Sequence, residues 1–349
     1  MADDAAARRA RVERLLEAAR AVASPERGAG RALRARLLET TGLSAANIEL
    51  GLTRCLELEP ARQDLDDLLA STPTTRRAHV LLSGNVFVAA LRAIAIGVAA
   101  SAAVQVRASR RDPALAEALH ALAPESFELT AKLQPEPGEH LWAYGSDATL
   151  ADVRASLPVG VWFHPHGAGF GAAVVDARAW SPSAARALAL DTALFDQRGC
   201  LSPRVVCVLG NLAQARDVAQ AIARELVALE VELPPGPVSA DDAAERRRRR
   251  DAAAYAFELF DAGSGWVSCS SELVIPPSAR NLHVAPTADP SRSLGPFAAH
   301  LTCIAADDER RGALRKAFPG ARLAALGQMQ CPVLDGPVDR RQTPSGELA

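Results

Sequence analysis

The sequence lacks several features that mark particular protein classes. Its 349 residues carry a formal net charge of -2, which argues against nucleic acid or an anionic membrane as a main partner. No apolar stretch reaches the roughly 18 residues of a membrane span, and the nearest, 86–106, is interrupted by Arg92 and Gln105. The amino-terminal segment has no apolar core before a cleavage site, so we expect no secretory signal.

The spacing of the cysteines and histidines argues against a metal site. The six cysteines stand at positions 55, 200, 207, 269, 303 and 331, and no two form a C-x-x-C motif. This spacing argues against a zinc knuckle. Because no secretory signal is expected either, we predict that the cysteines are free thiols in a reducing cytoplasm. His164 and His166 lie close in sequence but have no third ligand nearby, so we predict no metal site.

The apolar pattern predicts helices followed by an α/β arrangement. Residues 1–70 are rich in Ala, Arg and Leu with helical periodicity. We expect strands at 78–82, 103–107, 140–144 and 159–164, with helices at 86–100, 112–122 and 147–156. Alternation at this spacing predicts a parallel sheet with helices on both faces, and such sheets bind ligands at the carboxyl ends of their strands.

The pattern restarts after residue 166. We expect strands at 171–175, 204–209, 267–270, 273–275, 282–284 and 299–304, and helices at 182–195, 213–229, 239–260 and 307–317. The chain therefore divides into residues 1–165, residues 166–330 and a tail, 331–349, rich in Pro, Gly and charge. The arginine run 246–250 is typical of a solvated helix face, and a phosphate clamp is the alternative.

One cysteine stands in a setting that suits nucleophilic chemistry. Cys200 lies in a Gly-Cys-Leu-Ser-Pro turn between an apolar helical segment and a Val-rich strand. A thiolate in such a turn can be reached by substrate, and nearby backbone amides can hold the oxyanion that forms. The alternative is an inert cysteine that happens to lie in a turn.

Four separated segments resemble, in order, the aldehyde dehydrogenase superfamily and within it the LuxC-type acyl-CoA reductases. They are residues 83–119, AYGSDATLADVR at 143–154, FHPHGAGFGAAVVD at 163–176 and LFDQRGCLSPRVVCV at 194–208. The resemblance implies two doubly wound α/β domains with amino-terminal helices. Residues 1–165 would include the Rossmann-like nicotinamide-cofactor domain, and residues 166–330 would form the catalytic domain.

The resemblance also implies a reaction. Cys200 would attack an acyl thioester, of coenzyme A or of an acyl carrier protein, and a reduced nicotinamide would then supply hydride to give an aldehyde. Asn85 matches the family's asparagine, and its amide would hold the oxyanion together with the backbone N–H of Cys200. The alternative for Asn85 is a turn residue after Ser83-Gly84.

The same resemblance suggests cofactor contacts. Arg107 stands where the family commonly has a lysine facing the adenosine ribose, and its forked guanidinium suits a 2′-phosphate, so we expect NADPH, with NADH as the alternative. Ser109 follows as a ribose or phosphate contact. Gly145 and Ser146 form a strand-to-helix turn whose backbone N–H groups can meet a pyrophosphate.

The sequence departs from the hydrolytic members of this superfamily at His166. It stands 34 residues before Cys200, close to where those members carry a glutamate. Without that base, water is not activated to release an acid, which favours reduction of a thioester over oxidation of an aldehyde. Two roles are left open for His166: that of a proton donor and that of a structural turn residue.

Two other functions stay open. One is an aldehyde dehydrogenase working in the oxidative direction, and the other is a non-catalytic family member that binds nucleotide or an acyl-carrier partner. The resemblance implies a longer chain than these 349 residues, with the difference mostly ahead of Asn85 and after Cys200. We therefore expect the chain to lack either an arm for dimer exchange or part of the lid over the cofactor, and a homodimer is left open.

Overall fold

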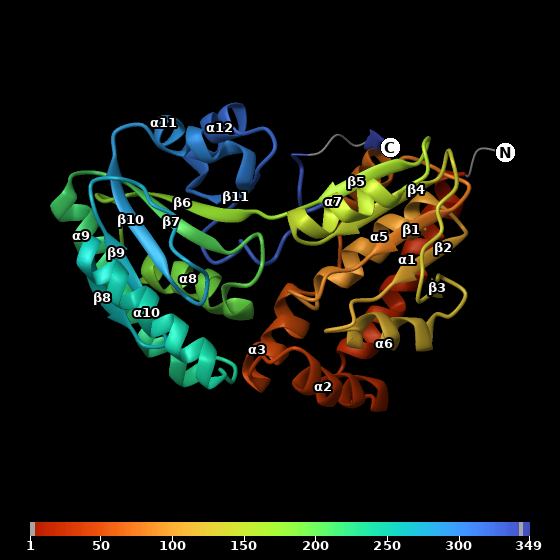
Figure 1. The fold of residues 1–349 in the computed structure, drawn as a ribbon, viewed down its shortest axis with the longest axis horizontal. Coiled ribbons are helices and arrows are strands. Elements are labelled where there is room, and N and C mark those ends of the chain that lie inside the picture. The colour runs from red at the N-terminus through yellow and green to blue at the C-terminus, as the bar shows by residue number, and fades with distance from the viewer. Residues whose placement is uncertain (1–3, 342–344) are drawn as a thin grey trace. The chain divides into compact units, whose positions relative to one another are not determined.

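The computed structural model describes residues 4–341 and 345–349 and divides into two compact units (Figure 1). Unit 1 consists of residues 1–42, 48–168 and 331–349, and unit 2 of residues 43–47 and 169–330. These units differ from the domains expected from the sequence in three respects. Unit 1 continues to residue 168, and the segment 331–349, expected as a separate tail, belongs to it. Residues 43–47, expected in the first domain, belong to unit 2.

Unit 1 contains a six-stranded sheet in the order β13-β5-β4-β1-β2-β3. Its strands are β1 Ala78–Leu81, β2 Val104–Arg107, β3 Glu128–Leu129, β4 His140–Tyr144, β5 Trp162–His166 and β13 Glu347–Leu348. All neighbouring strands are parallel except β13, which is antiparallel to β5. Ala78 pairs with both Val104 and His140, so β1, β2 and β4 end at one edge of the sheet.

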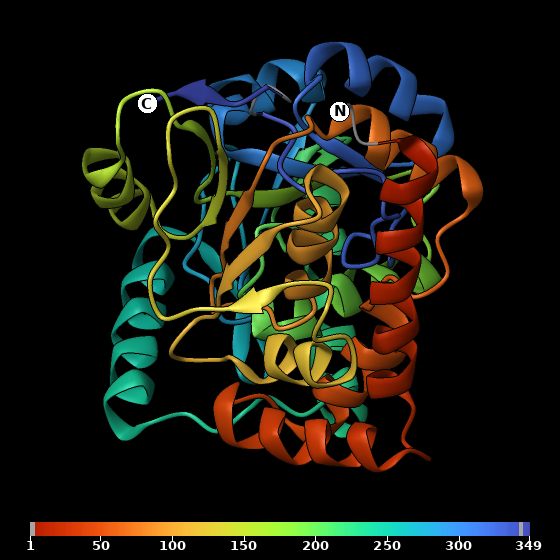
Figure 2. The ribbon, with the colours of Figure 1, turned by 90° about the vertical axis from the view of Figure 1, so that its right-hand side faces the viewer.

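Helices cover both faces of this sheet. They are α1 Ala5–Ala23, α2 Gly28–Thr40, α4 Arg62–Ser71, α5 Ala89–Ala100, α6 Ala114–Leu122 and α7 Asp147–Ser156, with α3 Ala45–Leu50 spanning the change of unit and the π-helix η1 Gly51–Cys55 after it. The apolar helix α5 packs between α1 and strands β1 and β2 (Figure 2). On the other face, α7 covers a cluster that includes Leu141, Ala143 and Phe163.

Unit 2 contains a seven-stranded sheet in the order β12-β11-β6-β7-β10-β9-β8. Its strands are β6 Phe170–Asp176, β7 Pro203–Leu209, β8 Glu258–Ala262, β9 Gly265–Cys269, β10 Leu282–Thr287, β11 Leu301–Ala305 and β12 Arg322–Ala324. Only the hairpin of β8 and β9 is antiparallel. The parallel α/β fold predicted from the sequence is therefore confirmed in both units.

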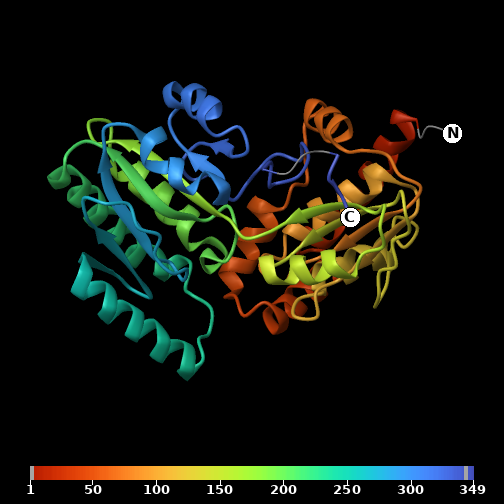
Figure 3. The same cartoon turned by 45° about the horizontal axis from the view of Figure 1, so that its top comes forward.

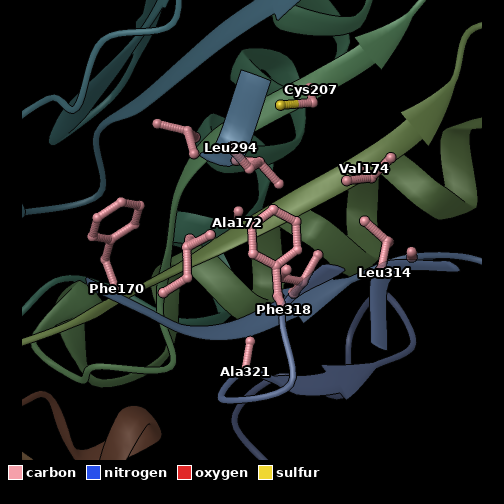
Figure 4. Close-up of a cluster of buried hydrophobic side chains, with 12 residues drawn as sticks. Phe170, Ala172, Val174, Cys207, Leu294, Leu314, Phe318 and Ala321 are labelled. Carbon is pink, nitrogen blue, oxygen red and sulfur yellow. The ribbon is translucent and has the colours of Figure 1, made fainter. Parts of the chain in front are cut away.

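The helices of unit 2 form layers on either side of its sheet. They are α8 Pro182–Ala193, η2 Leu194–Gln197, α9 Leu212–Glu232, α10 Ala240–Ala256, α11 Pro290–Leu294, η3 Gly295–His300 and α12 Asp308–Ala317. Helices α8 and α9 lie on one face, and α11 and α12 on the other (Figures 1 and 3). Beneath α11 and α12, Phe170, Val174, Cys207, Leu294 and Phe318 belong to one buried apolar cluster that joins helices to strands (Figure 4).

Two predicted elements of unit 2 are wrong. The helix expected at 239–260 ends at Ala256, and residues 258–262 form strand β8. The hairpin turn at Gly263, with a φ of 73°, lets β8 pair with β9, and this pairing outweighs helical continuation. Residues 273–275, expected as a strand, belong to an irregular connection between β9 and β10.

The arginine run lies on helix α10, which has no buried residue. Arg248 and Arg249 both form ion pairs with Glu245, and Arg250 forms one with Asp261. These contacts are those of a solvated helix face. No helix within the described residues combines the length and apolarity needed to cross a bilayer.

Candidate active site

Five of the residues singled out in the sequence lie at one edge of the unit 1 sheet. Asn85 follows β1, Arg107 ends β2 and Ser109 comes two residues later. Gly145 and Ser146 follow β4. These three strands are parallel and their first residues are in register. The structure therefore brings all five residues to the carboxyl edge, the edge where the carboxyl ends of the strands meet and where α/β sheets bind their ligands.

The loops after β1 and β2 touch each other. A Cβ atom on Gly84 would lie 2.6 Å from the Ser109 hydroxyl oxygen, so only glycine fits there without a shift of Ser109. The neighbouring Asn85 is exposed, and its amide has no hydrogen-bond partner within the part of the chain that the structure describes. The half-buried Arg107 guanidinium likewise has no ion-pair partner among the described residues.

The turn after β4 begins helix α7. The Ser146 hydroxyl oxygen accepts a hydrogen bond from the Thr149 N–H at 3.2 Å and so caps the helix. The carboxylate of Asp147, in the first turn, accepts the N–H of Ala168 at 2.9 Å. A carboxylate at this end already offsets part of the positive helix dipole, so an anion would be held less strongly than at an acid-free terminus. Arg107 and Ser109, expected from the sequence as cofactor contacts, therefore suit an anionic phosphate better than this turn does.

His166 ends β5 in a row of stacked rings that crosses β4 and β5. Trp142 stacks on His164 with ring centroids 4.4 Å apart, and Tyr144 stacks on His166 at 4.6 Å. His140 Nδ1 and His164 Nε2 are 2.9 Å apart. Burial lowers the pKa of His164 to about 3 and that of His166 to about 4.

These surroundings bear on both roles considered for His166. With its pKa near 4 the ring is neutral at pH 7, which disfavours an imidazolium that donates a proton. Both ring nitrogens are buried and have no hydrogen-bond partner in the described structure. His164 pairs with His140, so the two histidines of the His-Pro-His segment do not satisfy backbone groups as a structural turn would require.

In unit 2, the loop of Cys200 packs against the first residues of two neighbouring strands. Cys200 is half-buried, and its carbonyl oxygen accepts a hydrogen bond from the Thr302 hydroxyl on β11. The N–H of Gly171 on β6 donates to the Ser202 carbonyl at 2.8 Å. A Cβ on Gly171 would lie 2.4 Å from the Leu201 carbonyl oxygen, so the loop rests directly on the backbone of β6.

The backbone just before this loop is strained. Phe195, Asp196 and Gln197 have φ values of 53°, 50° and 60°, a left-handed conformation that is unfavourable for residues other than glycine. The Phe195 N–H donates to the side-chain oxygen of Asn47 at 2.8 Å. Strain of this kind persists only where the surrounding structure holds it, and it gathers at functional sites.

Two buried side chains from this segment hold it against the connection that precedes β10. Asp196 accepts a hydrogen bond from Arg280 at 2.8 Å. The Gln197 side chain donates to the carbonyls of Pro203 and Asn281 at 2.7 and 2.6 Å and accepts the Asn281 N–H at 2.9 Å. The sequence pattern did not indicate a role for Asp196, Gln197, Arg280 or Asn281. The Asp-Gln pair close before Cys200 was the only available signal, because Arg280 and Asn281 lie 84 residues further along the chain.

A third segment also packs on the Cys200 loop. The buried Asp191 carboxylate accepts the N–H groups of Gly327 and Met329 at 2.6 and 3.0 Å. Gln330 then donates to the Ser202 hydroxyl oxygen at 3.0 Å. The loop that bears the thiol is thus held from the β10 side, from β6 and β11, and from residues 327–330.

Comparison with solved structures identifies the fold. The chain is similar to an NAD-dependent benzaldehyde dehydrogenase from Corynebacterium glutamicum, with a TM-score of 0.67 and 14% identity over 92% of this chain and 81% of that one. It is also similar to aldehyde dehydrogenase 21 from Physcomitrella patens, solved with the reaction product succinate, with a TM-score of 0.66 and 13% identity over 99% and 82% of the two chains. The fold is that of the aldehyde dehydrogenases, as predicted.

The sequence comparison is more specific. Residues 137–323, more than half of the chain, match the family described as acyl-CoA reductase (LuxC). The chain therefore belongs to the LuxC acyl-CoA reductase family, which confirms the resemblance seen in the sequence. A comparison with curated protein sequences gives no match. Membership of this family supports an oxidoreductase.

Proposed function

We propose that the protein reduces an acyl thioester to an aldehyde, with the acyl group carried on Cys200 between two half-reactions. The observation that carries this proposal is the fixed loop around Cys200, which lies within the segment that matches the LuxC family. Three consecutive residues in left-handed conformation are maintained just before the thiol. Such strain, held by buried hydrogen bonds, is expected where a nucleophile must be kept in one position.

In the first half-reaction, the Cys200 thiolate attacks the carbonyl carbon of the thioester. A tetrahedral oxyanion forms and collapses, the sulfur of coenzyme A or of an acyl carrier protein leaves, and that sulfur takes a proton from solvent. The acyl group stays on Cys200 as a thioester. Asn85, by its match to the family asparagine, and the backbone N–H of Cys200 supply the donors that stabilise the oxyanion.

When bound, the reduced nicotinamide supplies the hydride that converts the acyl group to the aldehyde level. The same two donors then hold the oxygen of the thiohemiacetal on Cys200. Re-formation of the carbonyl breaks the carbon–sulfur bond, which releases the aldehyde and returns the Cys200 thiolate. No water molecule enters the reaction, so the chain needs no base to activate one.

The surroundings of His166 support reduction over oxidation to an acid. Oxidation would need a base that takes a proton from water beside the acylated cysteine. His166 stands near the family position of that base, but its buried ring has a pKa of about 4 and is a weak base at neutral pH. His166 stacks on Tyr144, and this packing gives the residue a structural role that requires no proton transfer.

The carboxyl edge of the unit 1 sheet supports a dinucleotide with a 2′-phosphate. Arg107 and Ser109 would hold the adenosine ribose and its phosphate, while Gly145 and Ser146 would meet the pyrophosphate. Because the Arg107 guanidinium has no ion-pair partner among the described residues, it can pair with a phosphate without breaking an existing contact. We therefore propose NADPH as the preferred cofactor.

The test is anaerobic incubation of the purified protein with NADPH and a panel of acyl-CoA thioesters. Loss of cofactor absorbance and trapped aldehyde are measured for the wild type, for Cys200→Ala and for Cys331→Ser, which removes another half-buried thiol under reducing conditions. We expect aldehyde from the wild type and from Cys331→Ser, and none from Cys200→Ala. Aldehyde formation by Cys200→Ala, or the absence of an acyl adduct on Cys200 by mass spectrometry, would refute the proposal.

A further inference from the structure

A pair of thiols lies in unit 1, away from the residues assigned above. The sulfur atoms of Cys55 and Cys331 are 3.6 Å apart, although the two residues are 276 positions apart in the sequence. Cys55 ends the π-helix η1, and Cys331 is the first residue of the carboxyl-terminal segment of unit 1. π-Helical turns are rare and are found frequently at functional sites.

The two cysteines differ in exposure, and the pKa of the Cys331 thiol is lowered. Cys55 is buried, whereas Cys331 is half-buried. A cavity of about 200 Å³ is lined by both cysteines and by Arg54. The hydrogen bond from Cys55, and then the positive charge of Arg54, lower the pKa of Cys331 to about 7. A large fraction of Cys331 is therefore thiolate at neutral pH, and the thiolate is the reactive form.

A buried arginine keeps the two sulfur atoms together. Arg92 on α5 donates to the Glu57 carboxylate at 2.7 Å, two residues after Cys55. The same guanidinium donates to the Pro332 carbonyl at 3.2 Å, directly after Cys331. Arg92 thus contacts a side chain two residues from Cys55 and the backbone directly after Cys331, and it links the two segments that carry the cysteines.

From these contacts we infer that Cys331 and Cys55 form a redox-modification site that reacts with hydroperoxides and closes to a disulfide. The Cys331 thiolate attacks one peroxide oxygen, the O–O bond breaks and hydroxide leaves, which gives a sulfenic acid on Cys331. The sulfur of Cys55 then attacks the sulfenic sulfur, the S–O bond breaks, and hydroxide leaves with the Cys55 proton as water. Two thiols are oxidised and one hydrogen peroxide is reduced to two water molecules.

Closure needs only a small approach of the two sulfur atoms. A disulfide bond is about 2 Å long, so the sulfur atoms, now 3.6 Å apart, must approach by about 1.5 Å. The bond would join the carboxyl-terminal segment to η1, and a thiol reductant would reverse it. This segment includes Asp339 and Arg341, whose charges act on buried His166. The modification site does not depend on the reaction proposed for Cys200.

The experiment uses the full chain, reduced, freed of reductant and treated with hydrogen peroxide at pH 7. After the remaining thiols are blocked, digestion at arginine gives residues 55–62 and residues 323–340 as the peptides of the two cysteines. We expect these peptides to be found joined, and separated again by reductant. We also expect a rise in Tm of the oxidised protein.

Variants separate the two chemical steps. In Cys55→Ser the second step is blocked, so the sulfenic acid on Cys331 should persist and be trapped by dimedone. We expect about tenfold more dimedone label on Cys331 than on the buried Cys303. The reason is that a thiolate reacts with peroxide faster than a protonated thiol does. Cys331→Ser should yield neither the joined peptides nor the label on Cys55. Cys269→Ser, which removes a different buried thiol, should leave the joined peptides unchanged.

Two results would overturn the inference. One is peroxide oxidation of Cys200 or another cysteine while residues 55–62 and 323–340 stay unlinked in the wild type. The other is linkage of these peptides to other cysteines in preference to each other. Both are read from mass spectra, so neither depends on enzyme activity.

Discussion

Arg280 and Asp196 form a buried ion pair, with Arg280 Nη2 2.8 Å from Asp196 Oδ1 and only 2% of the arginine exposed. The pair joins two strained pieces of backbone, because Arg280 itself has a φ of 61° and Asp196 a φ of 50°. Asp196 stands four residues before Cys200. The ion pair therefore connects the conformation ahead of the proposed nucleophile to the connection that leads into β10.

Removing the arginine charge should destabilise unit 2. Arg280→Met leaves the buried Asp196 carboxylate without its main partner, and a buried pair broken in this way typically costs about 3–5 kcal/mol. Urea denaturation measures the loss, and Arg247→Met, at an exposed position on α10, should change stability by less than about 0.5 kcal/mol. Equal stability of the two variants would show that the backbone conformation does not depend on the ion pair.

The fold of unit 1 was largely readable from the sequence because its signals are local. Strand β4 and helix α7 begin and end where predicted, since an apolar strand is followed by a Gly-Ser turn with a serine cap. The carboxyl-edge residues followed from the parallel order of those strands. By contrast, the short strands β3, β12 and β13 have two or three residues each and carry no periodic signal.

The support of the Cys200 loop could not be predicted, because it depends on contacts between distant segments. Nothing in the residues around Arg280 indicates that its guanidinium is buried against Asp196, and no rule of local propensity favours three left-handed residues in succession. The lowered pKa of His166 likewise comes from packing of rings across β4 and β5. The sequence indicated the nucleophile, while long-range packing determines how it is held.

A side chain at position 171 should disturb the Cys200 loop. In Gly171→Ala the new Cβ would lie 2.4 Å from the Leu201 carbonyl oxygen, so backbone must move. We expect a loss of about 1–3 kcal/mol in stability, as for an overpacked core, and a lower kcat for aldehyde formation. Gly312→Ala on α12 meets no atom within 4 Å and should stabilise the protein by about 0.5–1 kcal/mol with kcat unchanged. Unaltered stability and kcat in Gly171→Ala would contradict the tight packing of this loop on β6.

Arg107 should determine the choice between the two nicotinamide cofactors. If its guanidinium pairs with the 2′-phosphate, Arg107→Ala loses a charge-assisted contact and raises KM for NADPH by roughly tenfold to a hundredfold. KM for NADH should change little, since that cofactor has no 2′-phosphate. Arg110→Ala, an exposed arginine in the same loop, is the matched control. Parallel losses for NADPH and NADH in Arg107→Ala would assign the residue to another part of the dinucleotide.

The buried histidine His164 should make stability fall as the pH is lowered. An unfolded histidine binds a proton below about pH 6.5, whereas burial lowers the pKa of His164 to about 3, so between these values the unfolded state holds more protons and is favoured by acid. Between pH 7 and pH 5 this amounts to about 2 kcal/mol for one histidine. Urea denaturation measures the unfolding free energy at both pH values. From pH 7 to pH 5 this free energy should fall by about 2 kcal/mol less in His164→Gln than in the wild type. The decrease that remains in the variant is due to the other buried histidines. His300→Gln, at an exposed position, should keep the full decrease, and a wild-type decrease in His164→Gln would show that His164 is not held neutral in the fold.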